Sequence, residues 1–524
     1  MENNDHKIDE ILSARNGHLY IEECDTTKLV KNFGSPLFVV SEQQLRENVK
    51  RFSSAFSQFW PDGPVDILPA NKANWNTAVR TILSEEGAGA DIYSEGELHS
   101  ALQCNVDPNL ISVNGGGKSD QMLKKCIESD VRITVEDLDE PERINQIAKS
   151  LNKVAKIRFR VKPDFPNLWK RTDFSLESAS IDIGIQVYKS GIPAQYLETL
   201  GKQVLKMKHL ELTGLHFHGG RHSNSLWYWK GMMKRYAQLV THLCDAWGGY
   251  RPKELDIGGG FATERDPHSK LGERENTIMT FFTYPLELAM YGLTATGRYK
   301  VLSSMIEKVM VKMPGTQKAP SIEQYAETAV STFRNTLLKG GLNLDGIRLQ
   351  VEPGRGFYGN TGIHLTKVKK FKQQTKPMKM NWVLTDTTYF YLSGGIYEYN
   401  FHDFRIANNV NGTPKHVADI VGHSCYADRI SPLVKVPDIK EGDIVAYLDM
   451  GAYQEVSASN FNALPRPAML LVNGSKAEVI KRAETIEDVF SRDIIPERLQ
   501  RKSQKATTTE EDAVAEASKE IENA

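Results

Sequence analysis

Lys72 stands directly after a short apolar stretch of the chain, in Leu68-Pro69-Ala70-Asn71-Lys72-Ala73-Asn74. A primary amine can form an imine with a carbonyl carbon. Most lysines are solvated surface residues, so Lys72 alone would indicate little. The motifs found farther along the chain decide how it is interpreted.

Two later motifs also follow apolar, strand-like segments: Gly258-Gly259-Gly260 and Glu352-Pro353-Gly354-Arg355. Glycine N–H groups can approach a phosphate closely because no Cβ stands in the way, although a run of glycines alone is more often only a turn. The carboxylate of Glu352 could stabilise a nearby positive charge by charge attraction. The alternative for Glu352 is a solvent-facing residue at a strand end.

Three histidines lie close together in the sequence, His216, His218 and His222, and could suggest a metal site. No carboxylate or cysteine stands at ligand spacing beside them. A histidine near an apolar strand end is more often a structural residue. The sequence therefore predicts no metal.

The five cysteines are odd in number, far apart in the chain and never in C-x-x-C spacing, which argues against disulfides and against structural zinc. A reducing compartment, the cytoplasm, is expected. Cys425 lies in a polar motif, Gly422-His423-Ser424-Cys425-Tyr426. A thiol, with an ordinary pKa of about 8.5, can donate and recover a proton near neutrality. A buried, inert cysteine is the alternative.

Eight strand-like segments separated by helix-length segments must position these residues. They cover residues 65–70, 88–92, 110–113, 131–135, 155–161, 212–216, 254–257 and 347–351. This rhythm predicts an α/β fold with a (β/α)8 barrel, and a doubly wound open sheet is the alternative. The barrel is favoured because Lys72, His218 and both glycine motifs each lie just past a strand, where a barrel carries its catalytic groups on one rim.

The predicted domain limits are an N-terminal extension over 1–35, a barrel over 36–362 and a mostly β domain over 363–500. Within the barrel, Ser41 and Gln44 predict a helix start, and residues 262–320 form an insertion too long for a loop. Residues 36–40 could pair with the β domain, for which strands are expected at 363–371, 380–385, 443–449 and 468–472. The charged tail, 501–524, is predicted to be disordered.

The composition of the 524 residues points to small-molecule partners. Lys and Arg together number 65 and Asp and Glu 66, so no global field favours nucleic acid or a membrane surface. The first ten residues are polar and acidic, and no apolar run is long enough to cross a bilayer. We expect no nucleic-acid partner and no membrane association.

The motifs, read together, resemble the diaminopimelate/ornithine decarboxylase family, and its diaminopimelate decarboxylases in particular. Besides the motifs already quoted, the resemblance rests on residues 89–98 (GADIYSEGEL), 214–218 (GLHFH), 256–261 (DIGGGF) and 451–453 (GAY). They occur in family order over about residues 34–493. The resemblance implies a pyridoxal 5'-phosphate cofactor, an alanine-racemase-like barrel with a β domain, and a head-to-tail homodimer that shares its active sites.

The same resemblance implies a role for individual residues. Lys72 would hold the cofactor as a Schiff base, Glu352 would face the pyridine nitrogen, and His218 would stack on the ring. Cys425 would reach the partner's site and handle protonation. The phosphate would be bound by Gly258, Gly259, Gly260, Gly354, Arg355 and Tyr453. Arg160 and Glu97 also match active-site positions.

Several departures from the family pattern concern substrate recognition. Gly220-Arg221 replaces a Gly-Ser pair, Asp182 replaces a lysine, Ser393 stands for the arginine of an Arg-Pro-x-x-Tyr motif, and an acid after the cysteine is Tyr426. The candidate substrate residues are Arg221, Tyr397, Tyr426 and Asp428. We therefore expect an amino-acid substrate whose distal group differs from that of diaminopimelate.

The favoured function is decarboxylation of an α-amino acid. The alternatives are an amino-acid racemase or another lyase on the same cofactor, and a non-catalytic homologue that binds the cofactor. Glu352 argues against the racemase, in which the resemblance would call for an arginine at this position.

Overall fold

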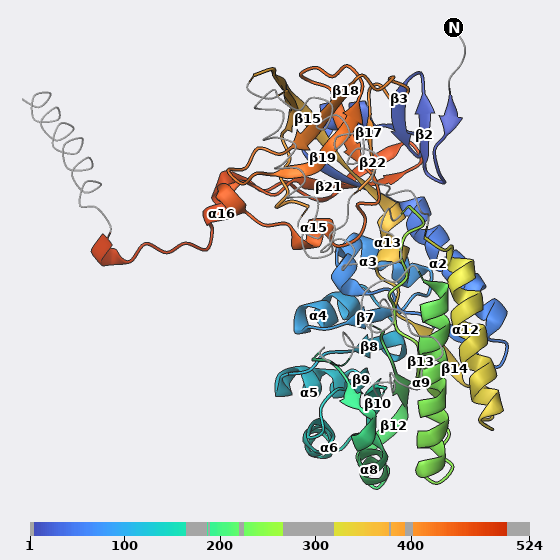
Figure 1. The fold of residues 1–524 in the computed structure, drawn as a ribbon. Helices are drawn as coiled ribbons and strands as arrows, with labels where there is room; N and C mark the ends of the chain where they lie inside the picture. Colours follow the sequence, from blue (N-terminus) through green and yellow to red (C-terminus); the bar gives the residue numbers. More distant parts are fainter. Residues whose placement is uncertain are drawn as a thin grey trace, which may run out of the picture.

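The computed structural model describes residues 5–163, 186, 189–219, 225–265, 319–376, 379–392 and 402–499. It consists of a barrel and a mostly β part that lies above it in Figure 1. The chain begins in the β part, enters the barrel and returns to the β part after residue 362.

The barrel contains all eight predicted strands in parallel. Their order around the sheet is β6 (Val65–Ile67), β14 (Arg348–Val351), β13 (Glu254–Asp256), β12 (Leu210–His216), β10 (Ala155–Lys162), β9 (Arg132–Val135), β8 (Ile111–Val113) and β7 (Ala90–Ile92). The ring closes between β6 and β7, where Ala70 bridges to Asp91 and the Gly89 N–H donates to the Ile67 carbonyl at 2.8 Å. The predicted barrel is confirmed, and the open-sheet alternative is wrong.

Helices follow the strands and cover the barrel. They are α2 (Glu42–Phe59), α3 (Thr77–Glu85), α4 (Glu95–Gln103), α5 (Asp120–Glu128), α6 (Glu140–Ser150), α8 (Ala194–Val204), α9 (Leu226–Ala246) and α12 (Ile322–Lys339). Ser41 caps α2 by accepting the Gln44 N–H at 3.0 Å, as its spacing predicts. The apolar stripe of α2 is buried because helical spacing places Leu45, Val49 and Phe52 on one face.

The second sheet contains β19 (Arg429–Val436), β18 (His416–Val421), β16 (Met380–Thr385), β15 (Gly362–Gln374), β5 (Leu37–Ser41), β21 (Ala468–Asn473) and β22 (Lys476–Lys481), in that order. Two further strands, β17 (Phe404–Ile406) and β20 (Ile444–Tyr447), join it through β15. β5 pairs antiparallel with β15 and parallel with β21. The segment just before α2 is therefore part of this sheet.

The N-terminal residues, for which the sequence suggested no elements, form a small sheet of β1 (His6–Lys7), β2 (Leu12–Arg15), β3 (His18–Ile21) and β4 (Cys24–Asp25), followed by α1 (Thr26–Phe33). Leu12, Leu19 and Ile21 share a buried apolar cluster with Val39 and Leu470 of the large sheet. This extension covers a face of the β part. Most of the predicted insertion and the tail 501–524 lie outside the described residues.

None of the described helices combines the length and the continuous apolar surface that crossing a membrane requires.

Candidate active site

Lys72 lies at the carboxyl end of β6, in the short 3-10 turn η1 (Asn71–Ala73). Its Nζ is 3.6 Å from Oδ2 of the buried Asp91, which lies in β7. The Lys72 side chain is 48% exposed. Burial of the amine acts to lower the pKa of Lys72, but the charges of Asp91, Tyr453 and Glu352 together outweigh it and the pKa is raised overall. The amine is thus held beside a carboxylate and remains open on one side.

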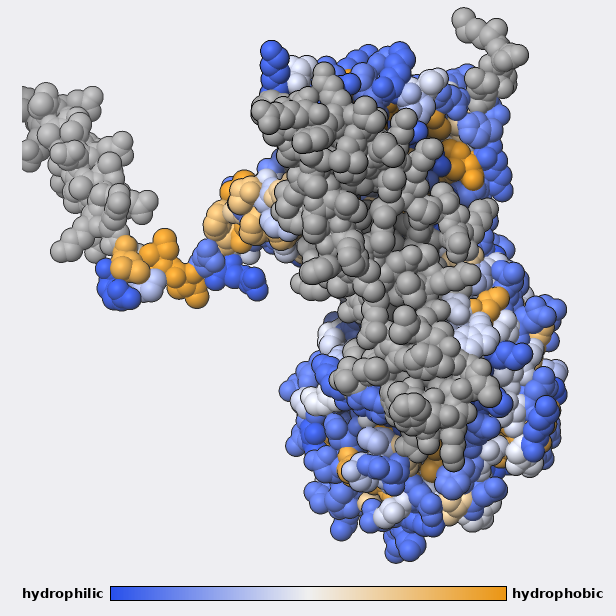
Figure 2. All heavy atoms as spheres, viewed as in Figure 1, coloured by the Kyte–Doolittle hydropathy of each residue, from blue (hydrophilic) through white to orange (hydrophobic). Residues whose placement is uncertain are grey.

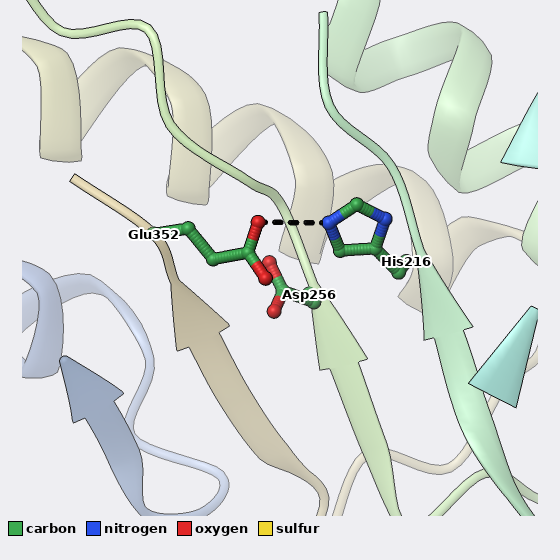
Figure 3. Close-up of side chains that lie close together, drawn as sticks. All are labelled: His216, Asp256 and Glu352. Carbon is green, nitrogen blue, oxygen red and sulfur yellow. Dashed lines mark hydrogen bonds and ion pairs between the residues drawn. The ribbon is translucent and has the colours of Figure 1, made fainter. Parts of the chain in front are cut away.

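Glu352 lies one residue past β14 and is almost completely buried. Its Oε1 accepts hydrogen bonds from Asn114 Nδ2 at 2.8 Å and Arg158 Nη2 at 2.9 Å, and also from Ser112 Oγ at 3.0 Å. Its Oε2 is bonded to His216 Nε2 at 2.9 Å (Figure 3). Burial acts to raise the pKa of Glu352, but His216 and then Arg158 hold it well below its usual value.

Asn114 connects the Lys72 group with the Glu352 group. Its Nδ2 donates both to Asp91 Oδ1 at 2.6 Å and to Glu352 Oε1 at 2.8 Å. Burial and the nearby charge of Glu352 raise the pKa of Asp91 to about 7. The amine and the two carboxylates therefore form one connected polar cluster inside the barrel rim.

Arg158 neutralises the deepest part of this cluster. The guanidinium is fully buried and donates to Asp256 Oδ2 at 2.7 Å as well as to Glu352. His216, Asp256 and Glu352 come from the ends of β12, β13 and β14 and have potential ligand atoms within 4.8 Å of one another (Figure 3). No carboxylate stands at ligand spacing beside His216 in the sequence, but the barrel brings Asp256 and Glu352 next to it from other strands. Since Arg158 already pairs with both, we interpret the trio as an ionic network.

His216 and His218 differ in their surroundings. His216 is fully buried, and burial lowers its pKa to about 4, so the neutral ring donates its Nε2–H to Glu352. His218 follows β12 and is only partly buried; burial, and then the charge of Arg160, hold its pKa well below the usual value. Of these two histidines, His218 is therefore the one that is partly accessible at the barrel rim.

The glycine motifs bring backbone close to the rim. Gly258, at φ +69°, follows β13, and a Cβ there would lie 2.6 Å from the Phe217 carbonyl oxygen. Gly259 and Gly260 continue the same loop. A Cβ on Gly354 would lie 2.4 Å from the hydroxyl oxygen of Tyr453. Because a side chain at either position would clash with these atoms, only the backbone of Gly258 and Gly354 faces the barrel rim.

Tyr453 and Arg355 come together although they are far apart in the sequence. The Arg355 guanidinium carbon lies 5.0 Å from the centroid of the Tyr453 ring. The Tyr453 N–H donates to the carbonyl of Ala73, the residue after Lys72, at 2.8 Å. Tyr453 of the β part thus reaches the Lys72 loop of its own chain.

The two residues with less defined roles lie near the same rim. Arg160, at the end of β10, pairs with Glu136 at 3.0 Å. Glu97, in the first turn of α4, accepts the Tyr93 N–H at 2.6 Å. Burial raises the pKa of Glu97.

Cys425, Tyr426 and Asp428 lie in one loop of the β part, between β18 and β19. Cys425 is exposed and its N–H donates to Asn462 Oδ1 at 2.9 Å. Tyr426 is 58% exposed, and its ring packs edge-on against Phe390. Asp428, in contrast, is 1% exposed. This burial disagrees with the expectation that its carboxylate faces substrate. The other substrate candidates, Arg221 and Tyr397, lie outside the described residues, together with Asp182 and Ser393.

Sequence reasoning missed Asp91, Asn114, Arg158 and Asp256 as members of the site. A signal was present: charged or polar residues occupy alternate positions of apolar strands, as in Arg158, Arg160 and Lys162 of β10. Because successive side chains of a strand point to opposite faces, such residues share the barrel interior.

Comparison with known proteins agrees with this arrangement. The family model for the pyridoxal-binding domain of pyridoxal-dependent decarboxylases matches residues 42–287. A diaminopimelate decarboxylase of Archaeoglobus fulgidus is 26% identical over 490 residues, which cover 93% of this chain and 100% of that protein. The Aquifex aeolicus diaminopimelate decarboxylase is 27% identical over 478 residues, covering 91% and 96%.

Solved structures share the fold. A diaminopimelate decarboxylase of M. jannaschii superposes with a TM-score of 0.77 at 24% identity, covering 94% of this chain and 99% of that one. A Vibrio vulnificus lysine/ornithine decarboxylase has a TM-score of 0.61 at 17% identity, covering 86% and 97%. Residues 42–287 thus match the pyridoxal-binding domain of pyridoxal-dependent decarboxylases, and over nearly its whole length the chain is similar to diaminopimelate decarboxylases.

Proposed function

We propose that this enzyme removes the α-carboxyl group of a polar or charged α-amino acid, with Lys72 as the residue that holds its pyridoxal phosphate. The observation that carries the proposal is the continuous link from the Lys72 amine through Asp91 and Asn114 to the ionised, buried Glu352. It joins an imine-forming amine to a fixed negative charge within one barrel rim.

The residues present fit the cofactor. The Lys72 amine is open on one side, and the backbone at Gly258 and Gly354 leaves no room for side chains. When bound, pyridoxal phosphate supplies an electron sink that accepts the electron pair left by the departing carboxylate. Gly259, Gly260 and Gly354 would bind its phosphate through backbone N–H groups, with Arg355 and Tyr453 alongside. The Gly258 N–H already donates to Asp256 Oδ1 at 2.7 Å, so Gly258 would contribute by letting the loop approach closely.

The other residues would then hold protons and orient the bound group. Glu352 would keep the pyridine nitrogen protonated, because its carboxylate is ionised and fixed by Arg158 and His216. His218 would lie against the ring. Asp91 would hold the Lys72 amine in position before and after it exchanges with the substrate amine.

The residue at position 352 also argues against the competing racemase function. A racemase needs its α-proton removed and returned, and the family resemblance associates that reaction with an arginine where this chain has Glu352. A carboxylate there strengthens the electron sink and favours loss of CO2.

We also propose that the enzyme is a homodimer in which Cys425 serves the partner's active site as a proton donor. Cys425 and Tyr426 are exposed on the β part. An arm containing α16 (Ile486–Phe490) and η6 (Glu497–Leu499) projects from the body of the chain and carries apolar patches between charged ones (Figures 1 and 2). Five of its apolar side chains are more than half exposed: Ile486, Phe490, Ile494, Ile495 and Leu499. A second copy would remove this surface from water.

Complementation between inactive variants tests the shared site. We expect mixed Lys72→Ala and Cys425→Ala proteins to regain activity after subunit exchange, because one site of each heterodimer would contain both native residues. Activity would be measured on heterodimers purified with two affinity tags. Inactive heterodimers, with active wild-type dimers handled in the same way, would rule the shared site out.

The cytoplasm is the compartment we propose, because all five cysteines are unpaired.

We propose that meso-diaminopimelate is not the best substrate. A second charged head group needs a partner of opposite sign, and leaving it unpaired costs on the order of 2–5 kcal/mol, or roughly thirtyfold to several thousandfold in affinity. Tyr426, where relatives carry an acid, is exposed and supplies no charge. Arg221 and Asp182 add charges that the family pattern lacks, and Arg221 is a candidate for binding a distal acid.

A steady-state comparison tests this prediction and the proposed function together. CO2 release would be measured with meso-diaminopimelate, ornithine, lysine, arginine, aspartate and glutamate. We expect at least one other amino acid to exceed meso-diaminopimelate in kcat/KM. A value highest for meso-diaminopimelate would overturn the substrate prediction while supporting decarboxylation.

A further inference from the structure

We infer that Asp428 is a positioning residue that fixes the loop carrying Cys425, and this inference rests on the proposed role of Cys425. Asp428 is 1% exposed, so its carboxylate is buried inside the β part. It does not lie at a surface where an amino-acid substrate could reach it. Its hydrogen bonds instead fix the backbone conformation of the loop that carries Cys425.

The carboxylate of Asp428 ties two segments together. Oδ2 accepts the N–H of Ser424, the residue before Cys425, at 2.9 Å. Oδ1 accepts the Tyr389 N–H at 2.5 Å and the Thr388 hydroxyl at 3.3 Å. One buried side chain therefore links the backbone beside the thiol to the turn after β16.

Backbone contacts complete the same link. The Gly422 N–H donates to the Asp428 carbonyl at 2.8 Å, and the His423 N–H donates to the Thr387 carbonyl at 3.0 Å. A Cβ on Gly422 would lie 2.4 Å from Asp428 Oδ2, so only glycine allows the carboxylate to approach this closely. Asp428 itself has φ +50°, a left-handed conformation that aspartate tolerates better than most residues.

The far side of the loop is held separately. The Cys425 N–H donates to Asn462 Oδ1, and the Tyr426 ring contacts Phe390, which stacks on Phe461 at 4.0 Å between ring centroids. Cys425 is exposed on a loop whose backbone is held in place by the buried carboxylate of Asp428. Proton transfer requires donor and acceptor within hydrogen-bond reach, so a loop fixed in this way sets where the thiol can act.

Asp428→Asn tests the inference with little change in shape. The amide keeps one acceptor oxygen but places an NH2 group where Oδ1 or Oδ2 accepts a backbone N–H. Asp443→Asn is the matched control: Asp443 is also buried in the β part and accepts the Lys440 N–H and the Asn408 amide, each at 2.8 Å, away from the Cys425 loop.

The first measurement is the mobility of a nitroxide label on Cys425 in the full-length protein. The label is selective because the other four cysteines are buried. We expect a clearly more mobile spectrum in Asp428→Asn than in the wild type or Asp443→Asn. Equal mobility in all three, or an equal gain in Asp443→Asn, would overturn the inference. Thr388→Val removes the hydroxyl that donates to Asp428 and accepts the Phe390 N–H at 3.2 Å, and it should show a smaller gain even if Asp428→Asn fails to fold.

The second measurement is CO2 release by the unlabelled variants with the best amino acid of the substrate comparison. We expect kcat of Asp428→Asn to fall about tenfold or more, with KM within about twofold of the wild type, because the thiol acts after substrate binding. An unchanged kcat with a mobile loop would contradict a role in the reaction. Absence of CO2 release from the wild type would refute the proposed function, and label mobility would then decide the inference alone.

Discussion

Lys72→Ala is expected to abolish covalent attachment of the cofactor and to lower decarboxylation by at least about a thousandfold. We expect this because no other lysine near the rim that the structure describes has an amine placed like that of Lys72. Lys72 Nζ is open on one side and is held by Asp91 at 3.6 Å. Lys118, another lysine near the rim, is buried and donates to the Gly115 and Thr134 carbonyls and to Glu140. It cannot replace Lys72 without breaking these bonds.

The measurement is borohydride reduction of the yellow protein, followed by mass spectrometry of its peptides. Wild-type protein should carry the reduced cofactor on the peptide that contains Lys72. Lys156→Ala is the control, since this lysine lies near the start of β10 and pairs with Asp130 at 2.6 Å. Reduced cofactor on a different lysine of the Lys72→Ala protein, under the same conditions, would show that the assignment is wrong.

Glu352→Gln is expected to lower kcat about 10²–10³-fold, equivalent to about 2.7–4 kcal/mol of transition-state stabilisation, with cofactor occupancy nearly unchanged. Glutamine keeps the shape of the side chain and one acceptor oxygen but removes the charge that would hold the ring nitrogen protonated. The substitution changes only the end of a side chain, so it leaves the backbone of the Gly258 and Gly354 loops, where we propose that the phosphate binds, in place. The effect should therefore appear in turnover and leave binding intact.

Ser112→Ala provides the matched control for Glu352→Gln. It removes one donor to Glu352 Oε1, at 3.0 Å, but leaves the carboxylate charged and bonded to Arg158 and Asn114. We expect less than a tenfold loss of kcat. Cofactor occupancy would be measured from bound absorbance and turnover from CO2 release. Unchanged turnover in Glu352→Gln would refute the electronic role of this carboxylate.

The barrel was predictable because each of its strands is a short apolar run bounded by turn residues, and because parallel strands bring their carboxyl ends to one rim. The polar residues that follow those runs were visible in the sequence. The cluster of Ser112, Arg158 and Asp256 was not, since its members come from three strands. Their proximity results from closure of the barrel and from strand register, which local spacing does not encode.

Other features escaped prediction for different physical reasons. The N-terminal sheet consists of strands of two to four residues, too short for a periodic pattern to stand out. Asp428 was grouped with the substrate residues by its position after Cys425. Its burial depends on Thr388 and Tyr389, which lie about 40 residues earlier in the chain.

The active site is expected to cleave the Cα–carboxyl bond of an amino acid. The most direct test incubates the protein loaded with pyridoxal phosphate with single amino acids and measures both released CO2 and the inverted stereoisomer. We expect one CO2 for each molecule of amine formed, with negligible inversion of the remaining amino acid. Accumulation of the inverted isomer without CO2 would contradict it and would identify a racemase.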